Sequence, residues 1–160
     1  MRDTFLSLDA GFHQGSVVRH LPNENAGKLE HSLESPERAR SSKGTALVVD
    51  DVSDVTEMLS VLLSHAGYAV VTASSAPQAL RVANEIQFDV IISDIGMPGM
   101  NGYQLARELR QLPGYEDVPL VAVTGYSMFD DRERSKSAGF NAHMTKPIDP
   151  SALLELIEQL

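Results

Sequence analysis

The chain has 160 residues, of which 42% are hydrophobic and 22% are charged, and a formal net charge of −9, which suits one globular domain with an additional segment. An acidic chain is a poor candidate for direct nucleic-acid binding, which needs clustered Lys and Arg, and without cysteine it has no disulfide and no thiolate metal site. No apolar run approaches the roughly 20 residues that would span a bilayer, so we expect a cytoplasmic protein without membrane insertion.

Residues 1–43 differ from the rest of the chain. Their apolar residues are scattered without a period, and the segment from Pro22 to Lys43 is almost wholly polar. Such a segment buries too little apolar area to offset the entropy lost on ordering. We therefore expect a mostly disordered tail and linker over 1–43, followed by a domain over 44–160.

From Thr45 onward, short apolar runs alternate with segments of helical periodicity. The expected strands are TALVVDD (45–51), YAVVTAS (68–74), FDVIISD (88–94), LVAVT (120–124) and AHMT (142–145). The expected helices lie in SDVTEMLSVLLSHAG (53–67), SAPQALRVANEI (75–86), NGYQLARELRQL (101–112), SMFDDRERSKSAG (127–139) and DPSALLELIEQL (149–160). Ser53, Ser75 and Asp149 are placed to cap their helices, and Gly67 to end the first helix.

This alternation predicts five β-α units. Short, fully apolar strands are typical of a parallel sheet that is covered on both faces. Right-handed crossovers then give a doubly wound α/β sandwich. In such sheets the binding crevice lies outside the carboxyl ends of the strands, so the residues that end the strands are the candidates for a functional site.

Four of the expected strands end on polar or charged side chains. Asp50 and Asp51 end the first strand, Asp94 the third and Thr124 the fourth, and Lys146 follows the fifth. Each residue alone has an ordinary explanation, because Asp can form a turn, Thr can cap a helix and Lys can be solvated. Solvated residues have no reason to recur at the same edge of a sheet, so together they indicate a site.

The residue types at this edge suggest phosphoryl chemistry. Three close carboxylates repel one another unless a cation lies among them. Carboxylates with a backbone carbonyl and waters suit Mg²⁺, and Zn²⁺ is disfavoured without a nearby His or Cys ligand. An Asp bound to Mg²⁺ can attack a phosphoryl group and form an aspartyl-phosphate. Lys146 and Thr124 would then supply a positive charge and a hydroxyl to the transferred oxygens.

The chain resembles the receiver domain of two-component response regulators over about residues 44–160. The matching segments are VVDD (48–51), DIGMPGMNG (94–102), VTGY (123–126), AGFNAH (138–143) and KP (146–147). The resemblance implies a (βα)5 fold with the flavodoxin-like strand order 2-1-3-4-5. It also implies a domain that catalyses only its own phosphorylation and dephosphorylation, rather than an enzyme.

The resemblance implies that Asp94 is the phosphoacceptor. It would take the phosphoryl group from the phosphohistidine of a histidine kinase or a phosphotransfer protein. Asp51, Asp94 and the backbone carbonyl of Gly96 would bind Mg²⁺, and Asp50 would act mainly through a coordinated water.

Three further residues follow from the same resemblance. Thr124 would donate a hydrogen bond to the phosphoryl group, and Lys146 would form an ion pair with it. Thr124 would also be one half of a conformational switch whose second half is usually Tyr or Phe. Here that position is His143. Pro147 follows the Lys in the family, often after a cis peptide bond.

Two positions tune the lifetime of the phosphoryl group in this family. They are Gly96, two residues after the acceptor, and Tyr126, two residues after the Thr. Gly96 has no side chain to position an attacking water, and Tyr126 is bulky enough to shield one. We expect slow self-dephosphorylation.

The helix expected after Thr124 is polar, because DDRERSKS (130–137) contains no apolar residue. Little burial would anchor such a helix, so it suits a switch beside the phosphorylation site. We expect output by contact with a downstream protein, through the face made by the fourth helix, the fifth strand and the last helix.

Alternatives remain open. The chain could be a degenerate receiver that serves only for docking. It could also be the excised end of a hybrid histidine kinase, because GFHQGSVVRHLPN (11–23) faintly resembles the end of a kinase ATPase domain and VTGY and AHMTKP resemble receivers of hybrid kinases. A dehalogenase-type phosphatase would need an Asp at Gly96, and a dinucleotide-binding module would need a Gly-rich loop after the first strand.

Overall fold

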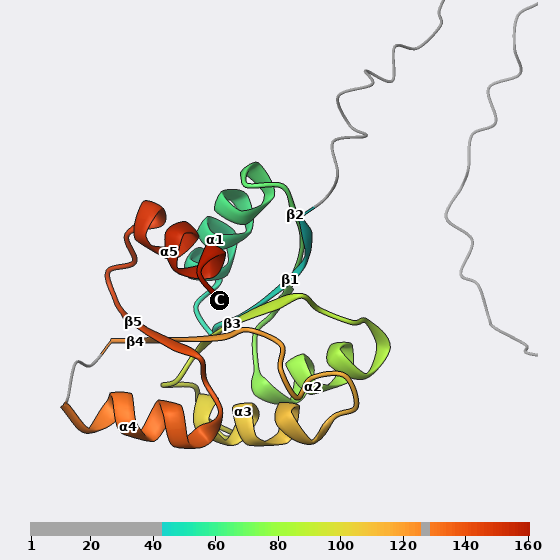
Figure 1. Ribbon diagram of the computed structural model, residues 1–160, viewed down its shortest axis with the longest axis vertical. Coiled ribbons are helices and arrows are strands. Elements are labelled where there is room, and N and C mark those ends of the chain that lie inside the picture. The colour runs from blue at the N-terminus through green and yellow to red at the C-terminus, as the bar shows by residue number, and fades with distance from the viewer. Residues whose placement is uncertain (1–42, 126–128) are drawn as a thin grey trace, which may run out of the picture. The chain divides into compact units, whose positions relative to one another are not determined.

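The computed structural model describes residues 43–125 and 129–160, and residues 1–42 of the predicted tail and Tyr126 lie outside this part. Within it, five strands alternate with five helices (Figure 1). The strands are β1 Gly44–Val49, β2 Tyr68–Ala73, β3 Val90–Asp94, β4 Leu120–Thr124 and β5 Ala142–Thr145. The helices are α1 Ser53–His65, α2 Ala76–Glu85, α3 Gly102–Gln111, α4 Phe129–Ala138 and α5 Pro150–Glu158.

The strands form one parallel sheet in the order β2-β1-β3-β4-β5. In Figure 1, α1 and α5 cover one face of this sheet, and α2, α3 and α4 cover the other. The predicted doubly wound fold and its flavodoxin-like strand order are therefore confirmed. Because every strand is parallel, all five carboxyl ends lie along the same edge.

Each central strand buries side chains on both faces of the sheet. In β3, Ile91 packs into the core beneath α2, α3 and α4, whereas Val90 and Ile92 pack into the core beneath α1 and α5. All three are at most 2% exposed. Burying a side chain of this size contributes about 1.5–3 kcal/mol. This two-sided burial explains why the strand reads as an unbroken apolar run.

The predicted caps are right at two helices and wrong at one. Ser75 and Asp149 each accept a hydrogen bond from the backbone N–H three residues later, as an N-cap does. Ser53 is instead the first residue of α1, and the N-cap position is Val52, which makes no side-chain cap. The backbone N–H of Val52 donates to Asp50 Oδ1 at 2.9 Å, so a carboxylate of the candidate site directs the chain into α1.

Arg110, near the end of α3, joins two loops at the amino-terminal ends of β4 and β5. Its guanidinium donates to the carbonyl oxygens of Tyr115 at 2.6 Å and Val118 at 2.8 Å, in the loop before β4. It also donates to the carbonyl oxygen of Gly139 at 2.7 and 3.0 Å and to Asn141 Oδ1 at 2.7 Å, before β5. One side chain therefore ties both loops to α3, at the end of the sheet opposite to the candidate site.

Candidate functional site

Three of the predicted site residues form an ion-paired cluster at the carboxyl edge of the sheet. Asp50 directly follows β1, Asp94 is the last residue of β3, and Lys146 directly follows β5. Lys146 Nζ lies 2.8 Å from Asp50 Oδ2 and 3.3 Å from Asp94 Oδ1. Asp50 is 2% exposed and Asp94 is 6% exposed, so the two carboxylates are held out of water with one ammonium group between them.

Asp51 completes a set of three carboxylates. One carboxylate oxygen from each of Asp50, Asp51 and Asp94 lies within 4.8 Å of the others, and Asp51 is the exposed member. An all-oxygen donor set with one open side suits a hard divalent cation that keeps some of its waters, such as Mg²⁺. The chemistry of the donor set therefore fits the ion that the sequence predicts.

The electrostatics of the cluster favour binding of a cation. Burial is the main cause that raises the pKa of the Asp94 carboxyl; Lys146 opposes this effect, and the charges of Asp50 and Asp51 add to it. Burial alone would lower the pKa of Lys146, but its hydrogen bonds and ion pairs with Asp50 and Asp94 outweigh burial and raise it. Lys146 is therefore charged at neutral pH, and it neutralises only part of the negative charge around it.

Thr124 and Lys146 lie at the ends of neighbouring strands. Thr124 is the last residue of β4, is 5% exposed, and pairs in register with Thr145 of β5. The backbone N–H of Lys146 donates to the carbonyl oxygen of Thr124 at 2.8 Å. The peptide bond between Lys146 and Pro147 is cis, as the resemblance implies.

Two glycines lie next to the acceptor. A Cβ at Gly96 would lie 3.6 Å from Asp94 Oδ2, so this position adjoins the carboxylate that would carry the phosphoryl group. A Cβ at Gly102 would press on the carbonyl oxygen of Asp94 and lie 2.8 Å from Ile95 Cα. Gly102 also donates its backbone N–H to the carbonyl oxygen of Ile95 at 3.0 Å. Sequence reasoning took Gly102 only as a helix start and missed this close approach.

His143, at the predicted switch position, contacts α4. Its ring is partly buried in β5, and its Nδ1 lies 3.1 Å from the hydroxyl oxygen of Ser135. Ser135 is 1% exposed. The sequence predicted little burial for the polar helix, so this buried serine differs from the expectation. A hydroxyl can be buried when it has a hydrogen-bond partner, and His143 provides one here. Tyr126 lies outside the described residues.

The fold and the site together define a class of protein. They form a flavodoxin-like α/β domain whose carboxyl edge carries an acidic cluster and a lysine. No helix within the described residues is long and apolar enough to cross a membrane.

Comparison with known proteins identifies the family within this class. The model of the response regulator receiver domain matches residues 46–158, and the chain belongs to this family. It is a receiver domain of the kind used in two-component systems. Receiver domains are signalling modules rather than classical enzymes, they bind Mg²⁺ at an acidic pocket, and they interact with histidine kinases or phosphotransfer proteins.

The relatives range from a short protein to large regulators. An uncharacterised 14.6 kDa protein from the sodA1 3' region of Leptolyngbya boryana is 37% identical over 113 residues, which are 71% of this chain and 86% of that protein. The virulence sensor protein BvgS of Bordetella bronchiseptica is 37% identical over 118 residues, and the transcriptional regulatory protein GlrR of Escherichia coli K12 is 35% identical over 113. The matches cover 71% and 70% of this chain but only 10% of BvgS and 25% of GlrR.

Solved structures resemble the same part of the chain. The chemotaxis protein CheY4 of Vibrio cholerae has a TM-score of 0.70 and 33% identity, covering 72% of this chain and 96% of that one. The receiver domain of the sensor histidine kinase PA1611 of Pseudomonas aeruginosa has a TM-score of 0.64 and 27% identity, over 72% and 96% of the two chains. That structure has a magnesium ion coordinated in its active-site cleft.

Proposed function

We propose that the chain is a phosphoacceptor in a two-component phosphorelay. Asp94 takes a phosphoryl group from the phosphohistidine of a histidine kinase or phosphotransfer protein, with Mg²⁺ bound. The observation that carries this proposal is the position of Lys146, 2.8 Å from Asp50 and 3.3 Å from Asp94, in a cluster that Asp51 completes. A degenerate receiver used only for docking would have no need of this arrangement.

The residues have distinct roles in the transfer. A carboxylate oxygen of Asp94 attacks the phosphorus, the phosphorus–nitrogen bond breaks, and the imidazole of the donor leaves with the bonding electron pair. Asp51, Asp94 and the carbonyl oxygen of Gly96 would hold Mg²⁺, and Asp50 would act through a coordinated water. When bound, Mg²⁺ supplies positive charge to the phosphoryl oxygens.

Lys146 and Thr124 stabilise the product. Lys146 pairs with the phosphoryl oxygens, and the Thr124 hydroxyl donates a hydrogen bond to one of them. The backbones of both residues are held at strand ends before the reaction, so only side-chain movement is needed when charge develops.

The donor must reach Asp94 from the solvent side of the sheet edge, where Asp51 and the start of α1 lie. Val52, at the start of α1, is 47% exposed, and Met58 and Val61 further along the helix are 44% and 53% exposed. Val52 adjoins the reaction site, the other two lie further along the same helix, and exposed apolar side chains are suited to contact with a protein partner. We assign them to docking of the phosphodonor.

Output uses the face made by α4, β5 and α5. A cavity of about 630 Å³ lies on this face. Arg132, Lys136 and His143 line it together with the apolar Phe140 and Leu156. Charged and apolar groups side by side, with Glu133 beside Arg132 and Lys136, support contact with a downstream protein target.

The phosphoryl group on Asp94 is lost slowly. Gly96 adjoins the acceptor oxygen and offers no side chain that could orient an attacking water. Shielding by Tyr126 is the second reason. A Tyr126→Ala variant should lose phosphate faster than the parent in a time course of adduct decay, and an unchanged rate would contradict the shielding.

Phosphorylation with a small donor tests the proposal. The parent is incubated with Mg²⁺ and acetyl phosphate beside Asp94→Asn and, as a matched control, Asp117→Asn, because Asp117 is an exposed aspartate in the loop before β4. Intact-mass measurement should show one hydroxylamine-labile adduct on the parent and on Asp117→Asn. No adduct on the parent would refute the phosphoacceptor function in favour of a docking module, and an adduct on Asp94→Asn would refute the site assignment.

The alternative that the chain is the excised end of a hybrid histidine kinase rests on GFHQGSVVRHLPN (11–23), which lies outside the described residues. The match to the sensor protein BvgS covers 71% of this chain and is compatible with a hybrid-type origin. Expression of the chain from its own transcript would separate the two origins.

A further inference from the structure

The part of α4 whose side chains are described is mostly polar and exposed. Of its described side chains, 132–138, only Ser135 and Ala138 are buried. Ala138 is at the end of the helix, so little apolar area is buried along this stretch. The position of this part of α4 therefore depends on the contacts of individual polar residues. Two consecutive residues make such contacts, and they reach in different directions.

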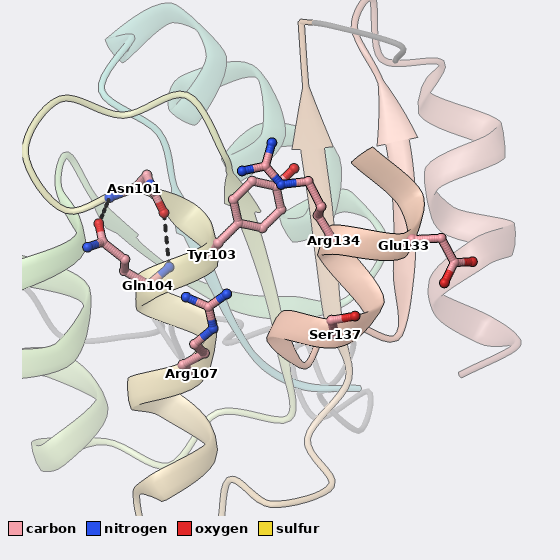
Figure 2. Close-up of a pocket in the computed structure, with 7 residues that line it drawn as sticks. All are labelled: Asn101, Tyr103, Gln104, Arg107, Glu133, Arg134 and Ser137. Carbon is pink, nitrogen blue, oxygen red and sulfur yellow. Dashed lines mark hydrogen bonds between the residues drawn. The ribbon is translucent and has the colours of Figure 1, made fainter. Parts of the chain in front are cut away.

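Arg134 contacts α3, the helix that follows the loop after Asp94. Figure 2 shows its guanidinium over the ring of Tyr103, in the cavity of about 370 Å³ between α3 and α4. Arg134 Cζ lies 5.4 Å from the centroid of the Tyr103 ring, within the range of a cation–π interaction. Glu133, the preceding residue, points away from this ring (Figure 2). The contact is therefore specific to one face of α4.

Tyr103 is coupled to the acceptor through the backbone. It directly follows Gly102, which packs against the backbone of Asp94 and Ile95 without room for a Cβ. The hydrogen bond from Gly102 N–H to the Ile95 carbonyl oxygen fixes the same connection. A displacement of the Asp94 loop therefore moves the first turn of α3, and with it the ring that Arg134 contacts.

Ser135, the next residue, contacts the strand β5 rather than α3. Its hydroxyl oxygen lies 3.1 Å from Nδ1 of His143 in β5. His143 pairs in register with Ala122, two residues before Thr124, and it lies three residues before Lys146. A displacement of β5 or a rotation of the His143 ring would break this hydrogen bond.

We propose that Arg134 and Ser135 form a two-point latch through which the phosphorylation state of Asp94 sets the position of α4. The latch consists of the contacts Arg134–Tyr103 and Ser135–His143. This inference rests on the proposed function, and it makes Arg134, Ser135 and Tyr103 positioning residues. It also explains why a serine is buried in a helix whose described side chains, apart from Ala138, are otherwise exposed.

The energy of such contacts matches what a switch needs. Losing one hydrogen bond changes an equilibrium by roughly 2- to 12-fold. Couplings between sites in proteins are typically about 5- to 150-fold. Two contacts acting together therefore fall within the range of a signalling switch, and neither is strong enough to lock α4 permanently.

Hydrogen exchange of the α4 backbone amides, with and without Mg²⁺ and acetyl phosphate, tests the coupling. The variants are Ser135→Ala and Arg134→Gln. Ser137→Ala and Arg132→Gln are matched controls, because they remove an exposed serine and an exposed arginine from the same helix. All four should form the Asp94 adduct as the parent does. The change in α4 exchange on phosphorylation should shrink by at least about twofold in the two latch variants and persist in the controls.

A second measurement tests the contact without phosphate. The ¹⁵N resonance of His143 Nδ1 should shift in Ser135→Ala and stay unchanged in Ser137→Ala. In a His143→Phe background, where this hydrogen bond is absent, Ser135→Ala should change α4 exchange less than it does in the parent background. An equal change in both backgrounds would mean that Ser135 does not act through His143, and the latch would be overturned.

The outcomes separate this inference from the function on which it rests. A parent without an adduct refutes both the proposed function and the coupling to Asp94. A parent that is phosphorylated, with latch variants that behave like their controls, refutes the latch alone.

Discussion

For the replacement of Gly102 by alanine, helix propensity and the packing in the structure predict opposite effects on stability. Helix propensity alone predicts that the change stabilises α3 by up to about 1 kcal/mol, because glycine loses more backbone entropy on folding. The structure predicts the opposite sign. The new Cβ would press on the carbonyl oxygen of Asp94 and lie 2.8 Å from Ile95 Cα. Both are backbone atoms, so no side-chain rotation relieves the contact.

The magnitude follows from these two effects. Overpacking costs about 1–3 kcal/mol, and a contact with rigid backbone belongs at the upper end of that range. After the gain from helix propensity, we expect a net loss of about 2 kcal/mol in the free energy of unfolding. For a domain of this size, such a loss lowers Tm by roughly 6–10 °C.

Thermal and urea unfolding followed by circular dichroism measure this loss. The matched control is Gly125→Ala, because a Cβ at Gly125 meets nothing within 4 Å. Since Asp94 also belongs to the acidic cluster, Gly102→Ala should bind Mg²⁺ more weakly than the control. A Gly102→Ala protein with a Tm equal to or above that of the parent would refute the reasoning.

Three further predictions concern the charged cluster. Lys146→Met leaves two buried carboxylates without their cation, so it should lose about 3–5 kcal/mol of stability in urea unfolding without Mg²⁺. Part of this stability should return when Mg²⁺ is added. A variant as stable as the parent in chelator would contradict the ion pairing. The pKa of Asp94 is raised in the folded state, so ionised Asp94 lowers the free energy of unfolding at a pH above that raised pKa. Below about pH 3.9, the ordinary pKa of Asp, the carboxyl is protonated in both states and this penalty is absent. Asp94→Asn should therefore raise Tm in Mg²⁺-free buffer at pH 7, with the gain vanishing below about pH 4 or with Mg²⁺; a gain that persisted at low pH would point to another cause. Asp51→Asn should weaken Mg²⁺ binding in a calorimetric titration without lowering Tm in chelator, because Asp51 is exposed and its charge only adds to the repulsion at Asp94.

The sheet edge could be predicted because it follows from chain order. In a parallel sheet every carboxyl end lies on one side, so reading Asp50, Asp94 and Lys146 as strand ends was enough to bring them together. The cap predicted at Ser53 was wrong because capping rules consider only neighbouring residues. The start of α1 depends instead on the carboxylate of Asp50, which accepts the N–H of Val52.

Other features depend on residues that are distant in the sequence. Gly102 meets Asp94 only after the loop has folded back, and Ser135 finds His143 only when α4 lies against β5. Arg110 bonds to Gly139, which is 29 residues away. No period, cap or motif in one sequence encodes these contacts, so they require the three-dimensional structure.

The hydrogen bonds of Arg110 bear on where this domain can be interrupted. Exposed loops with small and polar residues are usually the best places to insert a reporter or to open the chain. The loops 112–119 and 139–141 contain the exposed polar residues Glu116, Asp117 and Asn141, yet Arg110 donates to carbonyl oxygens in both loops. An insertion in either loop would displace oxygen atoms that accept from Arg110, the donor that both loops share. Although parts of these loops are exposed to solvent, they are poor sites for an insertion, and tags for this receiver belong elsewhere.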